Sequence, residues 1–295
     1  MVSSVSQVPE LRAHGQRGRG LGLAVLAYLL LSLAVGFVTL GALLVDVFQR
    51  GLPFLDRALL FDPPSVDPNI AGARPAILGT IYLMGLVFCF SVPLGVGAAL
   101  YLEEYANRER WYNRLLEVNI QNLAAVPSLI YGILGLAFIV RGPIGLGFVL
   151  LSGALILTLL VLPVVIIASR EAIRAVPSSI REGGYALGAT QWQVIWRSVL
   201  PAALPGMATG TILALSRAIG ETAPLILIGG LTYVAFDPTV LGPFTALPIQ
   251  IYNWTSQPQE QFRLLAAAAI ILLLLILLTM NAFAIWLRNR YQKRW

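Results

Sequence analysis

Long apolar runs separated by short polar stretches make up most of this chain. Six of the runs are long enough to cross a hydrocarbon layer of about 30 Å as α-helices. They occupy residues 21–46, 75–101, 119–140, 147–168, 207–230 and 264–287. The pattern therefore predicts an all-α polytopic membrane protein with about six transmembrane helices.

The basic residues between these runs predict the orientation of the chain. Fourteen of the 20 Lys and Arg residues lie before the first run, between the second and third, between the fourth and fifth, or after the sixth. Five lie in the remaining loops. Because cytoplasmic loops carry the excess of Lys and Arg, both termini are predicted to be cytoplasmic. The predicted parts are a tail at 1–20, a membrane domain at 21–288 with a cytoplasmic loop at 169–206 and external loops at 47–74 and 231–263, and a basic tail at 289–295.

Composition narrows the possible functions. Hydrophobic residues make up 58% of the chain and charged residues 12%, and the net charge of +6 is explained by topology rather than by nucleic-acid binding. The single histidine, His14, and the single cysteine, Cys89, favour neither a metal cluster nor a Ser-His-Asp triad. Lys293 is the only lysine, so a Gly-rich loop ending in Gly-Lys-Ser/Thr is absent. We expect no catalytic site, metal or cofactor in this chain.

Two features interrupt the regular pattern of spans. Pro127 lies inside the third run, where it removes a backbone donor and predicts a kink, either structural or lining a pathway. The external loop 231–263 contains the apolar stretch ALPIQIYNW, which predicts a short helix or re-entrant element. Tyr252 and Trp254 in this stretch are typical of an interfacial aromatic belt, and docking of an external partner is the alternative.

The polar insertion after the fourth run is predicted to form a compact helical hairpin. Ser179 and Glu182 have the spacing of a capping box, and Gly188 is placed to end the first helix. The stretch Thr190–Gln193 has the same box spacing and predicts the start of a second helix. That helix is expected to end at Pro201, where the chain returns to the membrane.

A charged pair lies inside the fifth run, in the sequence SRAIGETAPL. Arg217 and Glu221 are four residues apart, one turn of a helix, and both are expected to avoid lipid. The pair is either a structural ion pair between helices or a contact for an anion, since a guanidinium fits a tetrahedral oxyanion. Ser216 and Thr222 add hydroxyl groups nearby, and a glycine and a proline next to them are expected to loosen the helix.

The spacing within the insertion resembles the cytoplasmic signature loop of ABC importer permeases. Glu182 is followed by Gly188, then by Ser198 and the dipeptide Leu200–Pro201. The chain departs from the family pattern where Gly183 and Gly184 replace two alanines, which questions the stiffness of the helix, and where Ser198 replaces an apolar residue. The resemblance implies a coupling helix that docks in a groove of an ATPase subunit. The residues that would form it are Glu182, Gly183, Gly184, Gly188, Ala189 and Thr190.

A wider resemblance covers most of the chain. The stretches IYLMG, NLAAVPSLIYG, SRAIGETAPL and LPIQIYNW are similar to the A-type permeases (PstA) of high-affinity phosphate importers. The resemblance implies a non-catalytic subunit of a phosphate importer in the bacterial inner membrane. Its implied partners are a C-type permease (PstC), two ATP-binding subunits that use ATP and Mg²⁺, and an external phosphate-binding protein.

Other functions remain open from the residues alone. The chain is alternatively a C-type permease, or a permease for another oxyanion such as sulfate or molybdate. A secondary transporter in which Glu221 relays protons is a further alternative, although the first three runs contain no second Arg/Glu pair. The lack of His/Cys clusters and of paired carboxylates within the runs argues against a membrane-embedded enzyme.

Overall fold

The computed structural model describes residues 17–107, 109–230 and 234–291, and over these ranges the chain forms helices and loops with no strand. Residues 1–16 of the tail predicted at 1–20 and the end of the basic tail, 292–295, lie outside them, whereas residues 17–20 belong to the first helix. The chain divides into two compact units, residues 1–49 and residues 50–295. We call the second unit the helical domain. Within the described residues, five helices are long and apolar enough to span a membrane, or six if one bent pair counts as a single span.

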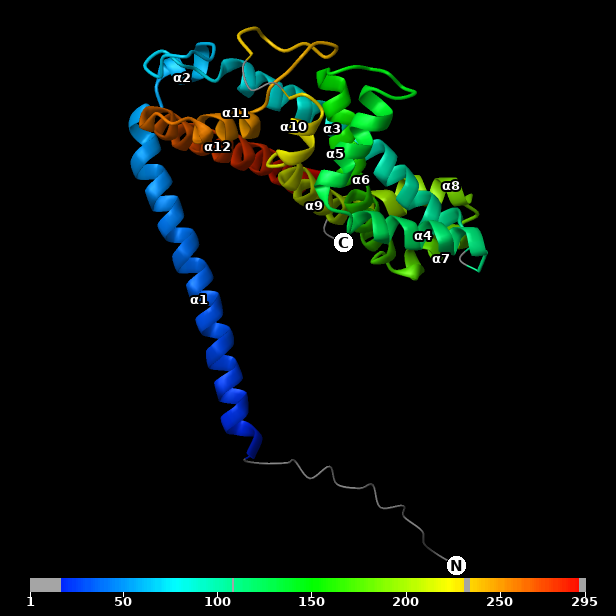
Figure 1. The fold of residues 1–295 in the computed structure, drawn as a ribbon. Helices are drawn as coiled ribbons and strands as arrows, with labels where there is room; N and C mark the ends of the chain where they lie inside the picture. Colours follow the sequence, from blue (N-terminus) through cyan, green and yellow to red (C-terminus); the bar gives the residue numbers. More distant parts are fainter. Residues whose placement is uncertain (1–16, 108, 231–233, 292–295) are drawn as a thin grey trace, which may run out of the picture. The chain divides into compact units, whose positions relative to one another are not determined.

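The N-terminal unit consists mainly of α1 (Arg17–Gly51), drawn in dark blue in Figure 1. The apolar stretch that begins at Gly22 is long enough to cross a bilayer, and none of its most apolar part is buried. This helix corresponds to the predicted run 21–46.

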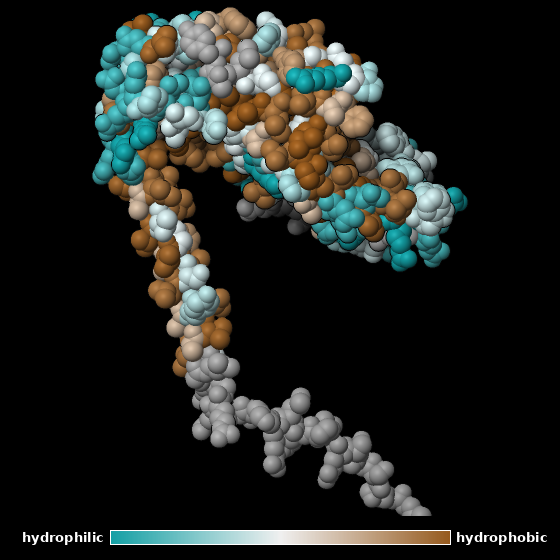
Figure 2. Space-filling view, viewed as in Figure 1, coloured by the Kyte–Doolittle hydropathy of each residue, from teal (hydrophilic) through white to brown (hydrophobic). Residues whose placement is uncertain are grey.

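Four long helices form the frame of the helical domain: α3 (Arg74–Leu100), α6 (Leu150–Arg174), α9 (Leu200–Ala218) and α12 (Glu260–Tyr291). The central one is α6, which packs against both α3 and α9 (Figure 1). Glycines allow these close approaches: Gly95 of α3 lies against Val165, and Gly210 of α9 lies against Ala168. Figure 2 shows hydrophobic side chains over the middle of the domain and hydrophilic ones at its ends, near α2 and over α7, as a membrane-spanning domain requires.

The third predicted run is broken into two helices. α4 (Trp111–Ala124) and α5 (Ser128–Gly135), which continues as one π-helical turn (Leu136–Val140), meet at an angle of 105°. Pro127 lies at this bend, as expected. The buried Tyr131 holds the bend closed, because its hydroxyl donates to the carbonyl oxygen of Leu123 at 2.8 Å. The bond joins α5 to the last turn of α4, whose Leu123 carbonyl oxygen also accepts from the Val126 N–H at 3.1 Å.

The fifth predicted run, 207–230, is also broken, at the stretch that Gly220 and Pro224 were expected to loosen. α9 ends at Ala218, and the five-residue α10 (Ala223–Leu227) begins after a turn. α10 packs on α5, where Gly132 lies so close to Pro224 that a Cβ on the glycine would approach the Pro224 Cα to 2.7 Å. Irregular backbone inside a membrane span is tolerated where protein covers it, and here the two broken spans cover each other.

The loops on the side away from the hairpin contain short helices. Residues 52–73 contain a 3₁₀ turn, η1 (Leu52–Phe54), and the short α2 (Arg57–Phe61), whose N-cap is the Asp56 carboxylate. The predicted short helix is α11 (Leu247–Ser256). Its Trp254 is 2% exposed and packs in the core against α12, so its predicted place in an aromatic belt is wrong; Tyr252 is exposed. Trp254 is buried because it lies on the face of α11 that packs against α12.

The hairpin consists of α7 (Ser178–Ala186) and α8 (Gln191–Val194). The predicted cap at Ser179 is wrong. The N-cap is Pro177, so the helix starts two residues earlier than predicted, and no side chain caps it. Gly188 has a φ of +78° and follows Leu187, the C-cap of α7, so it ends the helix as predicted. The predicted capping box from Thr190 is present.

The second hairpin helix does not end at Pro201. A π-helical turn, η4 (Ile195–Val199), joins α8 directly to α9, and the three segments form one span from Gln191 to Ala218. Pro201 is the second residue of α9, at the junction where the backbone hydrogen bonds return to the α-helical pattern. The hairpin is therefore continuous with the span that carries Arg217.

Candidate translocation and coupling sites

Arg217 and Glu221 lie on the two sides of the end of α9. Arg217 belongs to its last turn, and Glu221 lies in the turn that leads to α10. The Arg217 Nε is 3.5 Å from the Glu221 Oε1. A short charge-assisted hydrogen bond would be about 2.7–2.9 Å, so the two charges are paired loosely. The predicted pair therefore forms, but in a turn rather than within one helix.

The exposure of the two side chains differs. The Arg217 side chain is 56% exposed and that of Glu221 is 17% exposed. Arg217 follows Leu200 by 17 residues, about 26 Å along a helix axis, so the pair lies toward the end of the span away from the hairpin. Because a guanidinium in contact with lipid costs several kcal/mol, this face of α9 requires water or a second protein.

The hydroxyl residues predicted near the pair have separate contacts. Ser216 Oγ lies 2.7 Å from the carbonyl oxygen of Ile212 and 2.8 Å from Oδ1 of Asn281 on α12. Thr222 Oγ1 contacts the carbonyl oxygen of Gly220 at 3.4 Å, within the turn. Asn281 was not predicted as a site residue. In the sequence, Asn281 is marked only as the single amide inside the apolar run 264–287. In the structure its contact with Ser216 joins α9 to α12 next to Arg217.

The hairpin exposes apolar side chains at its tip. Leu187 is 89% exposed, Trp192 59% and Tyr185 45%. Glu182, on α7, is also exposed. α7 stays helical through Gly183 and Gly184, and Gly184 packs against Val194 of the second helix. The two glycines therefore leave the hairpin intact and bring its helices close together.

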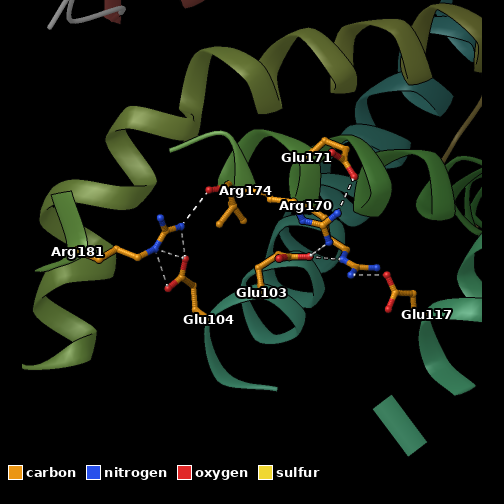
Figure 3. A network of polar contacts seen from close by, with 8 residues as sticks. Glu103, Glu104, Glu117, Arg170, Glu171, Arg174 and Arg181 are labelled. Atoms are coloured by element: carbon orange, nitrogen blue, oxygen red, sulfur yellow. Dashed lines mark hydrogen bonds and ion pairs between the residues drawn. The ribbon is translucent and has the colours of Figure 1, made fainter. Parts of the chain in front are cut away.

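A network of charged side chains anchors the hairpin to the membrane helices (Figure 3). Its centre is Glu103, in a π-helical turn, η2 (Tyr101–Tyr105), at the end of α3, with a side chain only 1% exposed. Glu103 accepts hydrogen bonds from Arg170 at 2.8 Å and Arg174 at 2.9 Å, both in the last turns of α6. Arg170 also donates to Glu117 of α4 at 2.8 Å.

The η2 turn also binds α7 directly, through Glu104. Arg181 of α7 donates to the Glu104 carboxylate at 2.7 Å and to the carbonyl oxygens of Val176 and Ile173. Gln191 of α8 donates to the Glu104 carbonyl oxygen at 2.6 Å. The network thus joins both hairpin helices to the ends of α3 and α6. Within the described ranges, no three His, Cys, Asp or Glu side chains gather as a metal site would require.

Comparison with known proteins identifies the family. Residues 91–294 match the model of the binding-protein-dependent transport system inner membrane component. The chain belongs to this family. Its members are permease components of transporters in the inner membrane, and the matched region of this permease includes both the hairpin and the Arg217–Glu221 pair.

Individual relatives agree with this assignment. The permease is 33% identical over 231 residues to a probable phosphate transport system permease protein PstA of Methanocaldococcus jannaschii, covering 76% of this chain and 80% of the relative. It is 32% identical over 220 residues to a phosphate transport system permease protein PstC of Xylella fastidiosa, covering 66% and 67%. A bacterial ABC transporter that imports alginate has a chain of similar fold, with a TM-score of 0.66, 18% identity and coverage of 92% and 96%.

The charged network is the part of this permease that sequence reasoning missed. Arg170, Arg174 and Arg181 entered the prediction only as positive charges that set the topology. Their partners Glu103, Glu104 and Glu117 come from stretches 53 to 77 residues away, so no local spacing indicates these pairings. The available signal was the adjacent Glu103 and Glu104 at the end of an apolar run, since carboxylates there require partners.

Proposed function

We propose that this permease is the A-type membrane subunit of an ATP-driven importer of inorganic phosphate. The observation that carries the proposal is the exposed guanidinium of Arg217, loosely paired with Glu221 at a break in an apolar span. The PstA relative, a phosphate transport permease by name, supports phosphate as the substrate.

The pair has the chemistry needed for transient anion binding. A guanidinium presents parallel N–H donors that match two oxygens of a tetrahedral oxyanion. The 3.5 Å separation from Glu221 leaves donors of Arg217 available to an anion. Because Glu221 cancels part of the positive charge, the anion is held weakly enough to leave, as conduction requires.

The exposure of Arg217 supports a second permease as partner. Lipid is an unfavourable neighbour for this side chain, so a related subunit facing α9 would complete a polar pathway between the two chains. We propose a C-type partner for that position and an external phosphate-binding protein as the donor of the anion. The assignment as A-type rather than C-type rests on the stretches SRAIGETAPL and LPIQIYNW.

The hairpin supplies a route for the driving force. In this proposal two ATPase subunits, which bind the ATP and Mg²⁺, contact Glu182, Gly183, Gly184, Gly188, Ala189 and Thr190 and the exposed Leu187. Movement of the hairpin is transmitted along the continuous span from Gln191 to Ala218, which ends at Arg217. In the same proposal, both termini lie in the cytoplasm together with the hairpin.

Reconstitution of the complete transporter tests this function. We expect labelled phosphate to enter proteoliposomes only with the binding protein outside and ATP inside, and excess unlabelled phosphate, but not sulfate or molybdate, to compete. Competition by sulfate would instead assign another oxyanion. Phosphate uptake by this chain alone, driven by an ion gradient, would contradict the proposal and favour a secondary transporter.

A second test addresses the hairpin. Leu187→Asp replaces the most exposed apolar side chain of the hairpin by a charged one. We expect at least a tenfold loss of ATPase co-purification, equivalent to about 1.4 kcal/mol of binding free energy. Leu187→Met, which keeps an apolar side chain of similar size, is the matched control and should retain the ATPase. Equal co-purification by the two variants would remove the hairpin tip from the interface.

A further inference from the structure

An apolar groove of about 620 Å³ runs along the helical domain between α3, α9 and α12. Small residues on the three helices create it: Pro93 and Gly97 on α3, Ala208 on α9 and Ala284 on α12. At Gly97 a side chain would meet nothing within 4 Å. The groove is therefore an open space between helices that the domain itself does not fill.

The length of the groove matches one leaflet of a bilayer. Its lining on α3 runs from Phe88, near the middle of the helix, to Leu100 at the end. Twelve residues of helix correspond to about 18 Å, slightly more than half of a hydrocarbon core of about 30 Å. Leu100 leads directly to Glu103 and the charged network. The groove thus begins near the membrane centre and ends at the surface that carries the hairpin.

A single cation lines the groove, on the turn of α12 beyond Ala284. Arg288 donates to Thr209 Oγ1 at 2.8 Å and to Asn289 Oδ1 at 3.1 Å. Both partners are neutral, and no carboxylate pairs with Arg288 within the residues that the structure describes. The indole of Trp196 also lines the groove, as is typical of side chains at the membrane interface.

We propose that this groove binds an anionic phospholipid of the hairpin-side leaflet, with an acyl chain along Gly97 and the phosphate on Arg288. The apolar lining matches an acyl chain. The guanidinium of Arg288, which directly follows the apolar run 264–287 and pairs with no carboxylate among the described residues, matches an anionic head group. The site depends only on the membrane-spanning fold and is separate from Arg217. It is therefore independent of which anion the transporter carries.

Native mass spectrometry of the purified transporter, with added phosphatidylglycerol or phosphatidylcholine, tests the site. We expect phosphatidylglycerol to be retained in preference, and Arg288→Gln to reduce its retention about tenfold, as the loss of a charge-assisted hydrogen bond predicts. The control is Arg290→Gln, because Arg290 lies in the same helical turn but stacks on Trp286. Equal retention of the two lipids by the unaltered protein would overturn the proposal.

Filling the groove with a larger side chain is the second test of the lipid site. Gly97→Leu is expected to abolish retention of the bound lipid, whereas Gly85→Leu, on α3 outside the groove and also in open space, should not. A protein segment is the competing occupant. To test for it, a cysteine is introduced as Gly97→Cys in a Cys89→Ser background. A cross-link from this cysteine to the partner permease in the assembled complex would show that protein fills the groove and would overturn the lipid site.

Discussion

Replacing Arg217 by glutamine is expected to abolish phosphate uptake while the transporter still assembles. The substitution keeps a polar side chain of similar length but removes the charge and the paired N–H donors. Loss of charged hydrogen bonds worth about 3 kcal/mol would lower uptake at limiting phosphate roughly a hundredfold. Labelled uptake into proteoliposomes, with co-purification of the partner subunits as the assembly check, provides the measurement.

Three further variants separate a substrate contact from a structural ion pair. Arg217→Lys keeps the charge and should retain partial uptake, because an ammonium lacks the planar fork. Glu221→Gln removes the competing carboxylate, so we expect tighter phosphate binding with slower maximal transport. Arg263→Gln removes an exposed charge at the start of α12 and should leave uptake unchanged. If Arg217→Gln and Glu221→Gln instead lowered complex stability equally and left uptake per assembled complex normal, the pair would be structural.

Breaking the charged network at Glu103 is expected to produce the largest loss of stability. Glu103→Gln leaves Arg170, whose side chain is 8% exposed, without its buried carboxylate. Removal of one partner from a buried ion pair costs about 3–5 kcal/mol. We expect a marked drop in the thermal unfolding temperature in detergent and detachment of the hairpin, visible as faster hydrogen exchange of the α7 amides.

Glu171→Gln is the matched control for this prediction. Glu171 also pairs with Arg174, at 3.4 Å, but its side chain is 65% exposed. Exposed ion pairs contribute about 0–1 kcal/mol, so the unfolding temperature should hardly change. Equal effects of the two substitutions would show that burial of Glu103 adds nothing to the anchoring of the hairpin.

Local patterns in the sequence were sufficient for much of the fold. The spans α3, α6 and α12 follow from apolar runs, because a chain in lipid must satisfy its backbone hydrogen bonds within each segment. Gly188 and the Thr190 box predicted the turn between the hairpin helices, since left-handed backbone and capping are short-range effects. The Arg217–Glu221 pair was also evident from spacing and chemistry.

Tertiary structure decided the features that depend on distant partners. The sequence placed Pro127 in a span, but the 105° bend requires the Tyr131 bond to Leu123 and the packing of α5 on α10. The break after Ala218 is likewise supported by α5, which covers the irregular backbone. Packing between helices thus determined the backbone conformation at both positions, where local propensity allowed more than one.

The charged network illustrates the same limit. By itself the sequence determined that this is a helical membrane protein with a capped hairpin and an Arg/Glu pair in a span, because each property arises within a few turns of chain. Only the folded structure brings Glu103 to Arg170, 67 residues away, and Asn281 to Ser216, 65 residues away. These pairings follow from how the helices pack, which no spacing along the chain records.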